Sequence, residues 1–387
     1  MRLFVWLLKK KGVLIACAIT ALITWLLTMY FSTYNQMFTY RYTKGLIERY
    51  YVDEINEKDL VEGSINGMFD ALGDEHSLYV PSSYGYDKFD SNVTGEFVGI
   101  GVSIKNVDGN CVVSEVFENS PAELSGILAN DIIIGADEMD LSGKDINEVA
   151  NAIRGEEGTF VNITVLRNGE VIGCNNIERK AIKAPSIKIK TLNDNIAYIH
   201  ITSFDGDTDK EISAALKDVK DKNSLIIDLR DNPGGRLDVV VKSIDLFLDQ
   251  GAVLITKYKN DKENVIYSED GVEYDKQVCV LVNENSASAS EIFAAALKDR
   301  GRAKIVGTRT YGKGSIQRVF PLPGNAGANI TIGRFYSPNR NIIDKVGVSP
   351  DIEIAIPDEF KDVSILEIPF EKDTQLQKTI EILKNDL

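Results

Sequence analysis

Histidine and cysteine are scarce in this sequence, and their positions exclude two common kinds of catalytic centre. The chain has two histidines, His76 and His200, and neither lies in a motif typical of a catalytic triad. The four cysteines are widely spaced, with no Cys-x-x-Cys pair. This spacing fits neither a disulfide framework nor a metal site. We therefore predict no metal and no cofactor, and any nucleophilic serine would need a base other than histidine.

Net positive charge is also missing, which bears on the partners that the chain can bind. Lysine and arginine number 43 and aspartate and glutamate 58, so the formal net charge is −15 at pH 7. No basic stripe with interleaved aromatic residues is present in the sequence. Because nucleic-acid binding depends on positive charge that neutralises phosphates, we predict no nucleic-acid partner.

One long uncharged run is present, at the N-terminus. Arg2, Lys9, Lys10 and Lys11 precede residues 12–31, which carry no charge. About 20 apolar residues suffice to span a bilayer, and the basic cluster favours a cytoplasmic N-terminus. A cleavable signal peptide is the alternative, but it would have a shorter apolar region followed by small residues. We therefore expect an uncleaved single-pass anchor with the rest of the chain outside the membrane.

Changes in composition and in the periodicity of apolar residues divide the chain into five predicted segments. Residues 1–33 would form a cytoplasmic tip and the anchor, 34–92 a helical region, and 93–180 a small barrel of strands with a helix. In residues 181–357 strands alternate with helices, which favours a partly parallel sheet covered by helices. Residues 358–387 end in an amphipathic helix, which either contacts a second copy of the chain or packs locally.

Two polar stretches follow buried strands of the predicted sheet. They are residues 231–235, "DNPGG", and residues 283–290, "NENSASAS". Active sites in α/β sheets form where strands end at their carboxyl ends. Asp228 and Asp231 flank the first strand end, and we interpret them as turn-capping residues that include an ion pair with Arg230.

Three serines spaced two apart precede an apolar helical run. Ser286 or Ser288 could stand at the helix N-terminus, where the helix dipole favours a developing anion, whereas Ser290 should lie inside the first turn. The backbone N–H of the residue after the nucleophile could then donate to an oxyanion. The alternative is a serine that merely caps the helix.

A lysine in a glycine turn offers the missing base. Lys313 lies between Gly312 and Gly314, and the alternation that follows predicts that residues 313, 315 and 317 share one face. A lysine acts as a base only when it is neutral, and burial and a nearby helix N-terminus favour the neutral amine. Gln317 could orient the lysine by accepting a hydrogen bond. A Ser–Lys dyad would thus replace the triad.

The same stretch nearly matches a phosphate-binding loop. Residues 307–314, "GTRTYGKG", have glycine where that motif needs serine or threonine, and a strand rather than a helix is predicted to follow. Nucleotide binding is therefore a poor interpretation of this stretch.

Residues 93–170 resemble a PDZ domain of the kind found in exported proteases. The resemblance rests on "EFVGIGVSI", "ENSPAELSGILANDIIIGAD" and "NEVANAIRGEEGTFVNITVLRNG". It implies that a glycine-rich loop captures the carboxylate of a protein tail while the adjoining strand pairs with the tail. The implied peptide-binding residues are Phe97, Val98, Gly99, Ile100 and Gly101. On the glycines alone, a tight turn or bulge is the alternative.

The whole sequence after the predicted anchor resembles the carboxyl-terminal processing serine peptidases, or tail-specific proteases. The matching stretches include "LIIDLRDNPGG", "NENSASASEIFAAALKDRGRAKIVGTRTYGKGSIQ" and "RFYSPNRNIIDKVGVSPDI". The resemblance implies a ClpP-crotonase-like α/β protease core with an inserted PDZ domain. It also implies the site residues: the nucleophile Ser288, the base Lys313, its supporting residue Gln317, and oxyanion donors at Ala289 and at Gly234 or Gly235.

Arg154 and the histidines complete the set of residues weighed. In some relatives an arginine near this place of the PDZ domain contacts the protease core when a tail binds, which implies a regulatory switch at Arg154. The alternative is a solvated arginine at a helix end. His76 matches a stretch common in the family, and we interpret His76 and His200 as structural residues.

The sequence therefore predicts a membrane-anchored serine endopeptidase on the outer face of a bacterial plasma membrane. It would bind exposed apolar C-termini of protein substrates, cleave them with a Ser–Lys dyad, and form a homodimer through its end helices. The alternative in another class is a non-catalytic PDZ scaffold, which would be expected to have lost Ser288, Lys313 or Gln317, and all three are present.

Overall fold

The computed structural model describes residues 2–86, 97–182, 185–193, 195–269, 271–361 and 363–385. For residues 2–17, 30–36 and 97 it describes the backbone only. The chain forms two compact units, residues 1–71 and 72–387, and each is treated by itself below.

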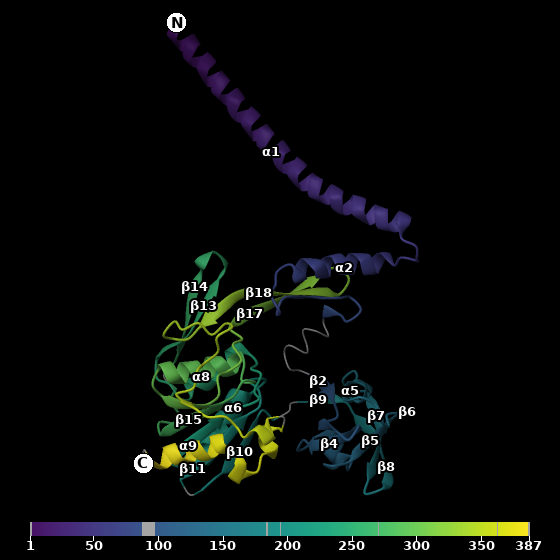
Figure 1. The fold of residues 1–387 in the computed structure, drawn as a ribbon, viewed down its shortest axis with the longest axis vertical. Coiled ribbons are helices and arrows are strands. Elements are labelled where there is room, and N and C mark those ends of the chain that lie inside the picture. The colour runs from purple at the N-terminus through teal and green to yellow at the C-terminus, as the bar shows by residue number, and fades with distance from the viewer. Residues whose placement is uncertain are drawn as a thin grey trace. The chain divides into compact units, whose positions relative to one another are not determined.

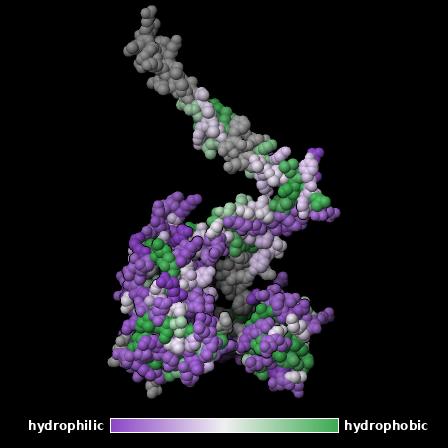
Figure 2. Space-filling view, in the orientation of Figure 1, coloured by the Kyte–Doolittle hydropathy of each residue, from purple (hydrophilic) through white to green (hydrophobic). Residues whose placement is uncertain are grey.

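The N-terminal unit consists of two helices, α1 (Arg2–Tyr50) and α2 (Glu57–Asp70). Asn56 caps α2 by accepting a hydrogen bond from the backbone N–H of Lys58 at 3.0 Å. No residue of α2 is buried. Hydrophobic side chains lie exposed along the described part of α1 and on α2, as Figure 2 shows. The expected helices are therefore present, although the first runs without interruption from the basic N-terminal residues.

The predicted membrane anchor over residues 12–31 lies within α1. Within the part of the chain that the structure describes, no helix has the length together with the hydropathy that a bilayer crossing requires. The side chains described in this stretch include threonines at 20, 24 and 28, two of which donate to backbone carbonyls of the same helix. This finding contradicts the predicted anchor, and with it the predicted location in a bacterial plasma membrane.

A six-stranded, mostly parallel sheet forms the core of the larger unit (Figure 1). Its strands, in spatial order, are β10 (Ile187–Thr191), β11 (Ile196–Ile201), β12 (Ser224–Asp228), β15 (Gln277–Val282), β16 (Ala303–Gly307) and β19 (Ile352–Glu353). All neighbouring pairs from β11 to β19 are parallel, and β10 pairs antiparallel at the edge. Every residue of β11 and β12 is buried, as expected for strands covered on both faces. The predicted parallel α/β core is thus confirmed.

Helices cover both faces of this sheet. On one face α6 (Thr208–Asp218), α7 (Leu237–Asp245) and α8 (Ala289–Asp299) form a core with strand residues such as Ile199, Leu225 and Val280. On the other face α9 (Thr374–Asn385) buries Ile380 and Leu383 against Tyr198 and its neighbours. The C-terminal amphipathic helix therefore packs locally, which was one of the two alternatives from the sequence.

A second, antiparallel sheet stands beside the core and was not foreseen. Its strands are β1 (Leu78–Val80), β13 (Gly251–Tyr258), β14 (Glu263–Ser268), β17 (Ser315–Leu322) and β18 (Ala326–Tyr336). The long strand β18 pairs with β1, β13 and β17. This arrangement places β1, from before the predicted PDZ domain, on the opposite edge of β18 from β17, the strand that follows Lys313.

The predicted PDZ region is a small β domain with two short helices. Its main sheet contains β3 (Val102–Val107), β4 (Asn110–Val116), β5 (Ile132–Ala136), β6 (Met139–Asp140), β7 (Phe160–Arg167) and β8 (Glu170–Glu178). A separate pair joins β2 (Phe97–Gly99) to β9 (Lys180–Ile182), and the helices are α4 (Pro121–Leu124) and α5 (Ile146–Ile153). Apolar residues from both strands and helices fill its core. The predicted start at residue 93 lies outside the described residues.

Short 3-10 turns complete the described elements. They are η1 (Lys259–Asp261), η2 (Asp358–Phe360), η3 (Ile365–Glu367) and η4 (Phe370–Lys372). The last three precede α9 in the C-terminal segment.

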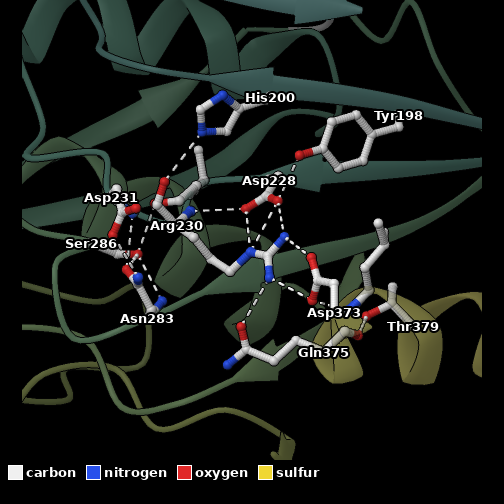
Figure 3. A network of polar contacts seen from close by, with 12 residues as sticks. Tyr198, His200, Asp228, Arg230, Asp231, Asn283, Ser286, Asp373, Gln375 and Thr379 are labelled. Atoms are coloured by element: carbon white, nitrogen blue, oxygen red, sulfur yellow. Dashed lines mark hydrogen bonds and ion pairs between the residues drawn. The ribbon is translucent and has the colours of Figure 1, made fainter. Parts of the chain in front are cut away.

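A buried ion cluster ties this C-terminal segment to the end of β12 (Figure 3). The guanidinium of Arg230 donates to Asp228 at 2.6 Å and to Asp373 at 2.8 Å, and also to Gln375 at 3.1 Å. The hydroxyl of Tyr198 donates to Asp228 at 2.8 Å. All of these side chains are buried. The predicted pairing of Arg230 with Asp228 is confirmed, and Asp373 is a further partner.

Burial and pairing act in opposite directions on the pKa values of this cluster. Burial by itself raises the pKa of the Asp228 carboxyl, but the charge and hydrogen bonds of Arg230 bring it below its ordinary value. Burial opposes the charge on Arg230, yet the two carboxylates hold its pKa above the ordinary value. Because the pKa of Asp228 is lower in the folded state, its contribution to stability is lost as the pH falls through that folded pKa.

Removing one member of the cluster should destabilise the fold. We expect Asp373→Ala to lower the free energy of unfolding by about 3 kcal/mol, because Arg230 then keeps a buried charge with one partner fewer. Urea unfolding followed by circular dichroism measures the change. The matched control is Asp358→Ala, which removes an exposed ion pair with Lys361 in the same segment and should change little. Equal effects of the two substitutions would contradict this account of the cluster.

Candidate active site

Residues 229–235 form a tight turn at the carboxyl end of β12, and its glycines lie against the serine-rich segment. The side chain of Asn232 donates to the carbonyl of Ile201 at 2.9 Å and accepts from the backbone N–H of Gly234 at 2.9 Å. Gly234 has φ 111°. A Cβ on Gly234 would lie 2.8 Å from Cβ of Ser288 and 2.9 Å from the backbone nitrogen of Ala289. Only glycine lets the turn approach the start of α8 this closely.

The three serines differ in burial and in hydrogen bonding. The hydroxyl of Ser286 donates to the carbonyl of Leu229 at 2.8 Å, and that of Ser290 donates to the carbonyl of Asn232 at 3.0 Å. Both outer serines are fully buried, so they hold the turn and the helix start together. Ser288 is half-buried. Its side chain lies in a capping box with the backbone N–H of Glu291, and its hydroxyl donates to no acceptor among the described residues. The middle serine is the one whose hydroxyl remains available.

Ser288 is the N-cap residue of α8 and has a strained backbone. Its φ is 54° and its ψ is −113°. This region of backbone space is costly for a residue with a side chain, and such strain often occurs at functional sites. The helix begins at the next residue, Ala289, whose N–H has no acceptor among the described residues. Nucleophile and helix cap were alternative roles for a serine in the sequence analysis. In the structure the predicted nucleophile, Ser288, is itself the N-cap residue.

A buried carboxylate joins this serine to the lysine loop. The two oxygens of Glu291 accept hydrogen bonds from four groups: the backbone N–H of Ser288 at 2.9 Å, the backbone N–H of Gly312 at 2.7 Å, the backbone N–H of Lys313 at 2.8 Å and the hydroxyl of Thr310 at 2.6 Å. Glu291 is fully buried. Burial raises the pKa of this carboxyl above its ordinary value, although the four hydrogen bonds oppose the shift.

Sequence analysis missed Glu291, although a signal for it was present. Ser288 and Glu291 have the Ser-x-x-Glu spacing of a capping box, in which the glutamate bonds back to the N-cap residue. That spacing indicates the bond to Ser288. Nothing in the sequence indicates the bonds to the loop 22 residues further on.

Lys313 lies in the loop between β16 and β17, within the glycine turn of the sequence, so the strand alternation of residues 315 and 317 does not extend to it. β17 begins at Ser315, and the backbone of Gly312 accepts a hydrogen bond from Lys345 N at 2.7 Å. The loop is also fixed by the N–H of Tyr311, which donates to the carbonyl of Ser286 at 3.1 Å. Lys313 is half-buried. Among the described residues, no hydrogen bond or ion pair joins its ammonium group to Ser288 or Gln317.

Gln317 lies on β17 and bonds to two hydroxyls. Its Nε2 donates to Oγ of Ser315 at 2.8 Å and to Oγ1 of Thr331 at 3.1 Å. Ser315 and Gln317 therefore share a face, as the alternation predicts. Thr331 is directly opposite Gln317 on β18. Both hydrogens of the amide group are used in this way, while the oxygen Oε1 keeps its capacity to accept.

The two predicted oxyanion glycines differ in their hydrogen bonding. The N–H of Gly234 already donates to the side chain of Asn232. The N–H of Gly235 has no acceptor among the described residues, and its φ is 143°. Of the two glycines, Gly235 is therefore the one whose N–H remains available beside that of Ala289.

The predicted peptide-binding residues lie at the start of the PDZ region. Phe97, Val98 and Gly99 form β2, which pairs with β9 along one edge, and no strand of the described chain pairs along the other. Ile100 is buried in the domain core. Gly101 has φ 89°, and a Cβ there would clash with Ser120. Gly101 therefore has the backbone of a tight turn, which was the alternative from the sequence. A tight turn at this position is also compatible with a loop that binds a carboxylate.

Arg154 is exposed and ends α5. Its backbone N–H donates to the carbonyl of Ala150 at 3.0 Å. The carbonyls at this helix end are instead capped by Arg179, which donates to Ile153 at 2.7 Å and to Ala152 at 3.3 Å. Arg179, and not Arg154, therefore caps the carbonyls of Ala152 and Ile153.

Three family descriptions match successive parts of the chain. Residues 32–83 match the N-terminal domain of the activating protease CtpB, residues 98–175 match the PDZ domain, and residues 195–354 match peptidase family S41. These matches follow the order helical region, PDZ domain and protease core that the sequence predicts.

Curated relatives and a solved structure agree with these matches. A carboxy-terminal-processing protease of Bartonella bacilliformis is 34% identical over 343 residues, covering 85% of this chain and 78% of the relative. The carboxy-terminal processing protease CtpA of Bacillus subtilis is 32% identical over 314 residues, covering 80% and 67%. The structure of a photosystem II D1 C-terminal processing protease is similar with a TM-score of 0.52 and 23% identity, covering 82% of this chain and 88% of the other. The last likeness concerns the fold alone.

Glu291→Gln should damage both the fold and any activity of this site. A glutamine has one oxygen instead of two, and its NH2 group would face backbone N–H donors. We expect the free energy of unfolding to fall by about 2–4 kcal/mol, because buried donors lose their acceptors. Urea unfolding measures this change. Glu284→Gln is the matched control, since Glu284 is exposed and bonds to Thr308 alone among the described contacts; an effect as large as that of Glu291→Gln would contradict the interpretation.

Proposed function

This chain belongs to peptidase family S41 and is a serine-type carboxy-terminal processing protease with a PDZ domain, and we propose that Ser288 is its nucleophile and Lys313 its general base. The observation that carries the proposal is the bridge through Glu291. One buried carboxylate bonds to the backbone of both residues, so the serine and the lysine loop are held at the same place. The half-buried, still available hydroxyl and the strained backbone of Ser288 favour it over Ser286 and Ser290, which are fully buried.

The proposed reaction has two stages. Neutral Lys313 takes the proton of the Ser288 hydroxyl as the serine oxygen attacks the carbonyl carbon of the scissile peptide bond. The carbon–nitrogen bond then breaks, and the lysine ammonium gives its proton to the leaving amine. Water attacks the resulting ester, again with Lys313 as the base, and releases the serine and the new carboxyl terminus.

Two backbone N–H groups are proposed to stabilise the oxyanion in both stages. They belong to Ala289, in the first turn of α8, and to Gly235, in the turn after β12. Donors that are already fixed by the fold need no reorganisation when the charge develops, which is the usual origin of large rate enhancements. The helix N-terminus at Ala289 adds a favourable dipole. Gln317 is proposed to support Lys313 through its available oxygen, Oε1.

Substrate selection is proposed to occur at the PDZ domain. The open edge of β2 supports the pairing of an extended protein tail with this strand, and the backbone of residues 97–101 would bind the terminal carboxylate. Apolar residues at the end of the tail would be favoured, because the neighbouring domain core is apolar. Arg154, exposed at the end of α5, remains a predicted regulatory residue.

Homodimer formation remains a prediction. The exposed apolar residues of the N-terminal helices support it. The C-terminal helix does not offer its apolar side, since that side packs on the protease core.

Substitution of the dyad tests the catalytic proposal. We expect Ser288→Ala and Lys313→Ala to lower cleavage of an unfolded protein by at least about 1000-fold, because each removes a group that acts in bond breaking. Fragments are followed by mass spectrometry. Lys262→Ala, at an exposed position, is the control and should cleave like the wild type. Cleavage that survives in Ser288→Ala would assign the nucleophile elsewhere, and tail binding without cleavage by the wild type would favour the scaffold.

Changes to the substrate tail test the PDZ proposal. An unfolded substrate with an apolar C-terminus should be cleaved with a KM about 10-fold lower than the same substrate with an amidated C-terminus or with two terminal aspartates. The reason is that amidation removes the charge that backbone N–H groups bind, while aspartates place charge against an apolar surface. Equal KM values for the three substrates would refute tail recognition and leave the dyad unaffected.

A further inference from the structure

Phe204 lies in the loop between β11 and α6, beside the glycine turn that follows β12. Its backbone N–H donates to the carbonyl of Gly234 at 2.8 Å, and its carbonyl accepts from the backbone N–H of Arg236 at 2.8 Å. These two bonds form a parallel bridge in which Gly235 is the residue opposite Phe204. Phe204 belongs to no motif that the sequence singles out, so its contact with the proposed oxyanion turn is new.

The bridge determines the direction of the Gly235 N–H. In a trans peptide the C=O of one residue and the N–H of the next point in opposite directions. The carbonyl of Gly234 points to Phe204, because it accepts a hydrogen bond from the N–H of that residue. The N–H of Gly235 therefore points away from Phe204. The N–H of Gly234 is already bonded to the side chain of Asn232, so the backbone of Phe204 directs the N–H that remains available.

The glycine turn fits tightly between Phe204 and the start of α8. A Cβ on Gly235 would collide with the backbone of Phe204, and a Cβ on Gly234 would lie 2.8 Å from Cβ of Ser288. Real Cβ atoms do not approach other atoms this closely, so only glycine fits at both positions. Any movement of the Phe204 backbone is thus transmitted directly to the turn.

The ring of Phe204 contacts the helix that carries the second proposed oxyanion donor. Its centroid lies 5.7 Å from the centroid of the Phe293 ring, and the two ring planes are inclined by 30°. Phe293 lies on α8, one turn after Ala289. Both rings are fully buried. Because side chains in a close-packed core have little room to shift, this ring pair fixes the distance between the backbone at residue 204 and α8.

We propose that Phe204 is a positioning residue that holds the N–H groups of Gly235 and Ala289 at the separation that one oxyanion requires. Its backbone directs the first donor, and its ring sets the distance to the helix of the second. The inference rests on the proposed function, in which these two N–H groups stabilise the oxyanion. Hydrogen bonds weaken steeply with poor length and angle, so a misplaced donor costs transition-state stabilisation more than substrate binding.

Phe247 offers a matched control, because it packs on the same ring of α8. Its centroid lies 5.8 Å from that of Phe293, and its side chain is also fully buried. Among the described contacts its backbone bonds to Ile244 and to the side chain of Arg302, and not to the glycine turn. Phe204→Leu and Phe247→Leu therefore each remove one ring from the same core, but only the first changes a residue that is bridged to the proposed oxyanion turn.

The two substitutions should have similar effects on stability and different effects on catalysis. We expect Phe204→Leu to lower kcat about 10-fold with KM within about two-fold, because the donors are misplaced while substrate contacts remain. Phe247→Leu should keep kcat within about two-fold, although its melting temperature should fall to within about 3 °C of that of Phe204→Leu. A fluorescence-quenched peptide with a free apolar C-terminus is the substrate, and thermal melting confirms that each variant is folded.

A transition-state analogue gives a readout that a merely structural role would not change. A peptide aldehyde forms a tetrahedral adduct with a serine nucleophile, and we expect it to bind about 10-fold more weakly to Phe204→Leu but not to Phe247→Leu. In the Phe293→Leu background, Phe204→Leu should lower kcat by less than about two-fold further, since the ring contact is already lost. If Phe204→Leu does not fold, Phe204→Met, which is closer to phenylalanine in volume, takes its place with the same expected results.

Four outcomes would overturn the proposal. They are a Phe204→Leu enzyme with wild-type kcat, equal losses of kcat in Phe204→Leu and Phe247→Leu, an unchanged affinity of Phe204→Leu for the aldehyde, and full additivity with Phe293→Leu. Continued cleavage by Ser288→Ala would instead show that the catalytic assignment itself had failed, and with it the premise of this inference.

Discussion

The geometry of the proposed active site depends on one buried carboxylate, that of Glu291. Its four donors come from two segments, the start of α8 and the loop before β17. Hydrogen bonds in a low-dielectric interior are strong, and leaving any of these donors without an acceptor would be costly. A loop rich in glycine, which would otherwise have many conformations, is thereby fixed to the helix that begins at Ser288. The position of Lys313 is thus fixed by the hydrogen bond of its backbone N–H to Glu291, independently of its side chain.

Close backbone approach is the second constraint. The turn at Gly234 lies where a side chain would collide with Ser288, and Ser286 and Ser290 hold the turn in place through its carbonyls. The repeated serines of the sequence therefore divide the work: two hold the turn and the helix start together, and the third remains available. Because all three residues are serines, the sequence alone cannot distinguish these roles. The burial of each side chain in the structure does distinguish them.

The sequence was sufficient for those parts of the fold that local patterns determine. Continuous apolar runs predicted the buried parallel strands, and the polar residues after two of them predicted the turn at 231–235 and the serine segment. Local patterns failed where contacts join distant segments. Lys313 was expected in a glycine turn, but the strand alternation of residues 315 and 317 was extended to it, which is one step too far. The antiparallel sheet was missed because β1 and β18 are separated by most of the chain. The predicted anchor was wrong, since no helix of the described residues has the length and hydropathy for a bilayer crossing.

Two buried carboxylates show why similar residues play different parts in this protein. Asp228 has a cationic partner, Arg230, which lowers its pKa, while Glu291 is held by backbone N–H groups and a hydroxyl, and burial raises its pKa. A buried ion pair can in principle be exchanged as a unit for apolar residues of similar size, because both charges are removed together. The donors around Glu291 cannot be exchanged in this way, since backbone N–H groups are present whatever the side chain. The ion cluster therefore contributes stability that other residues could also supply, whereas Glu291 provides acceptors that the turn and the loop themselves require.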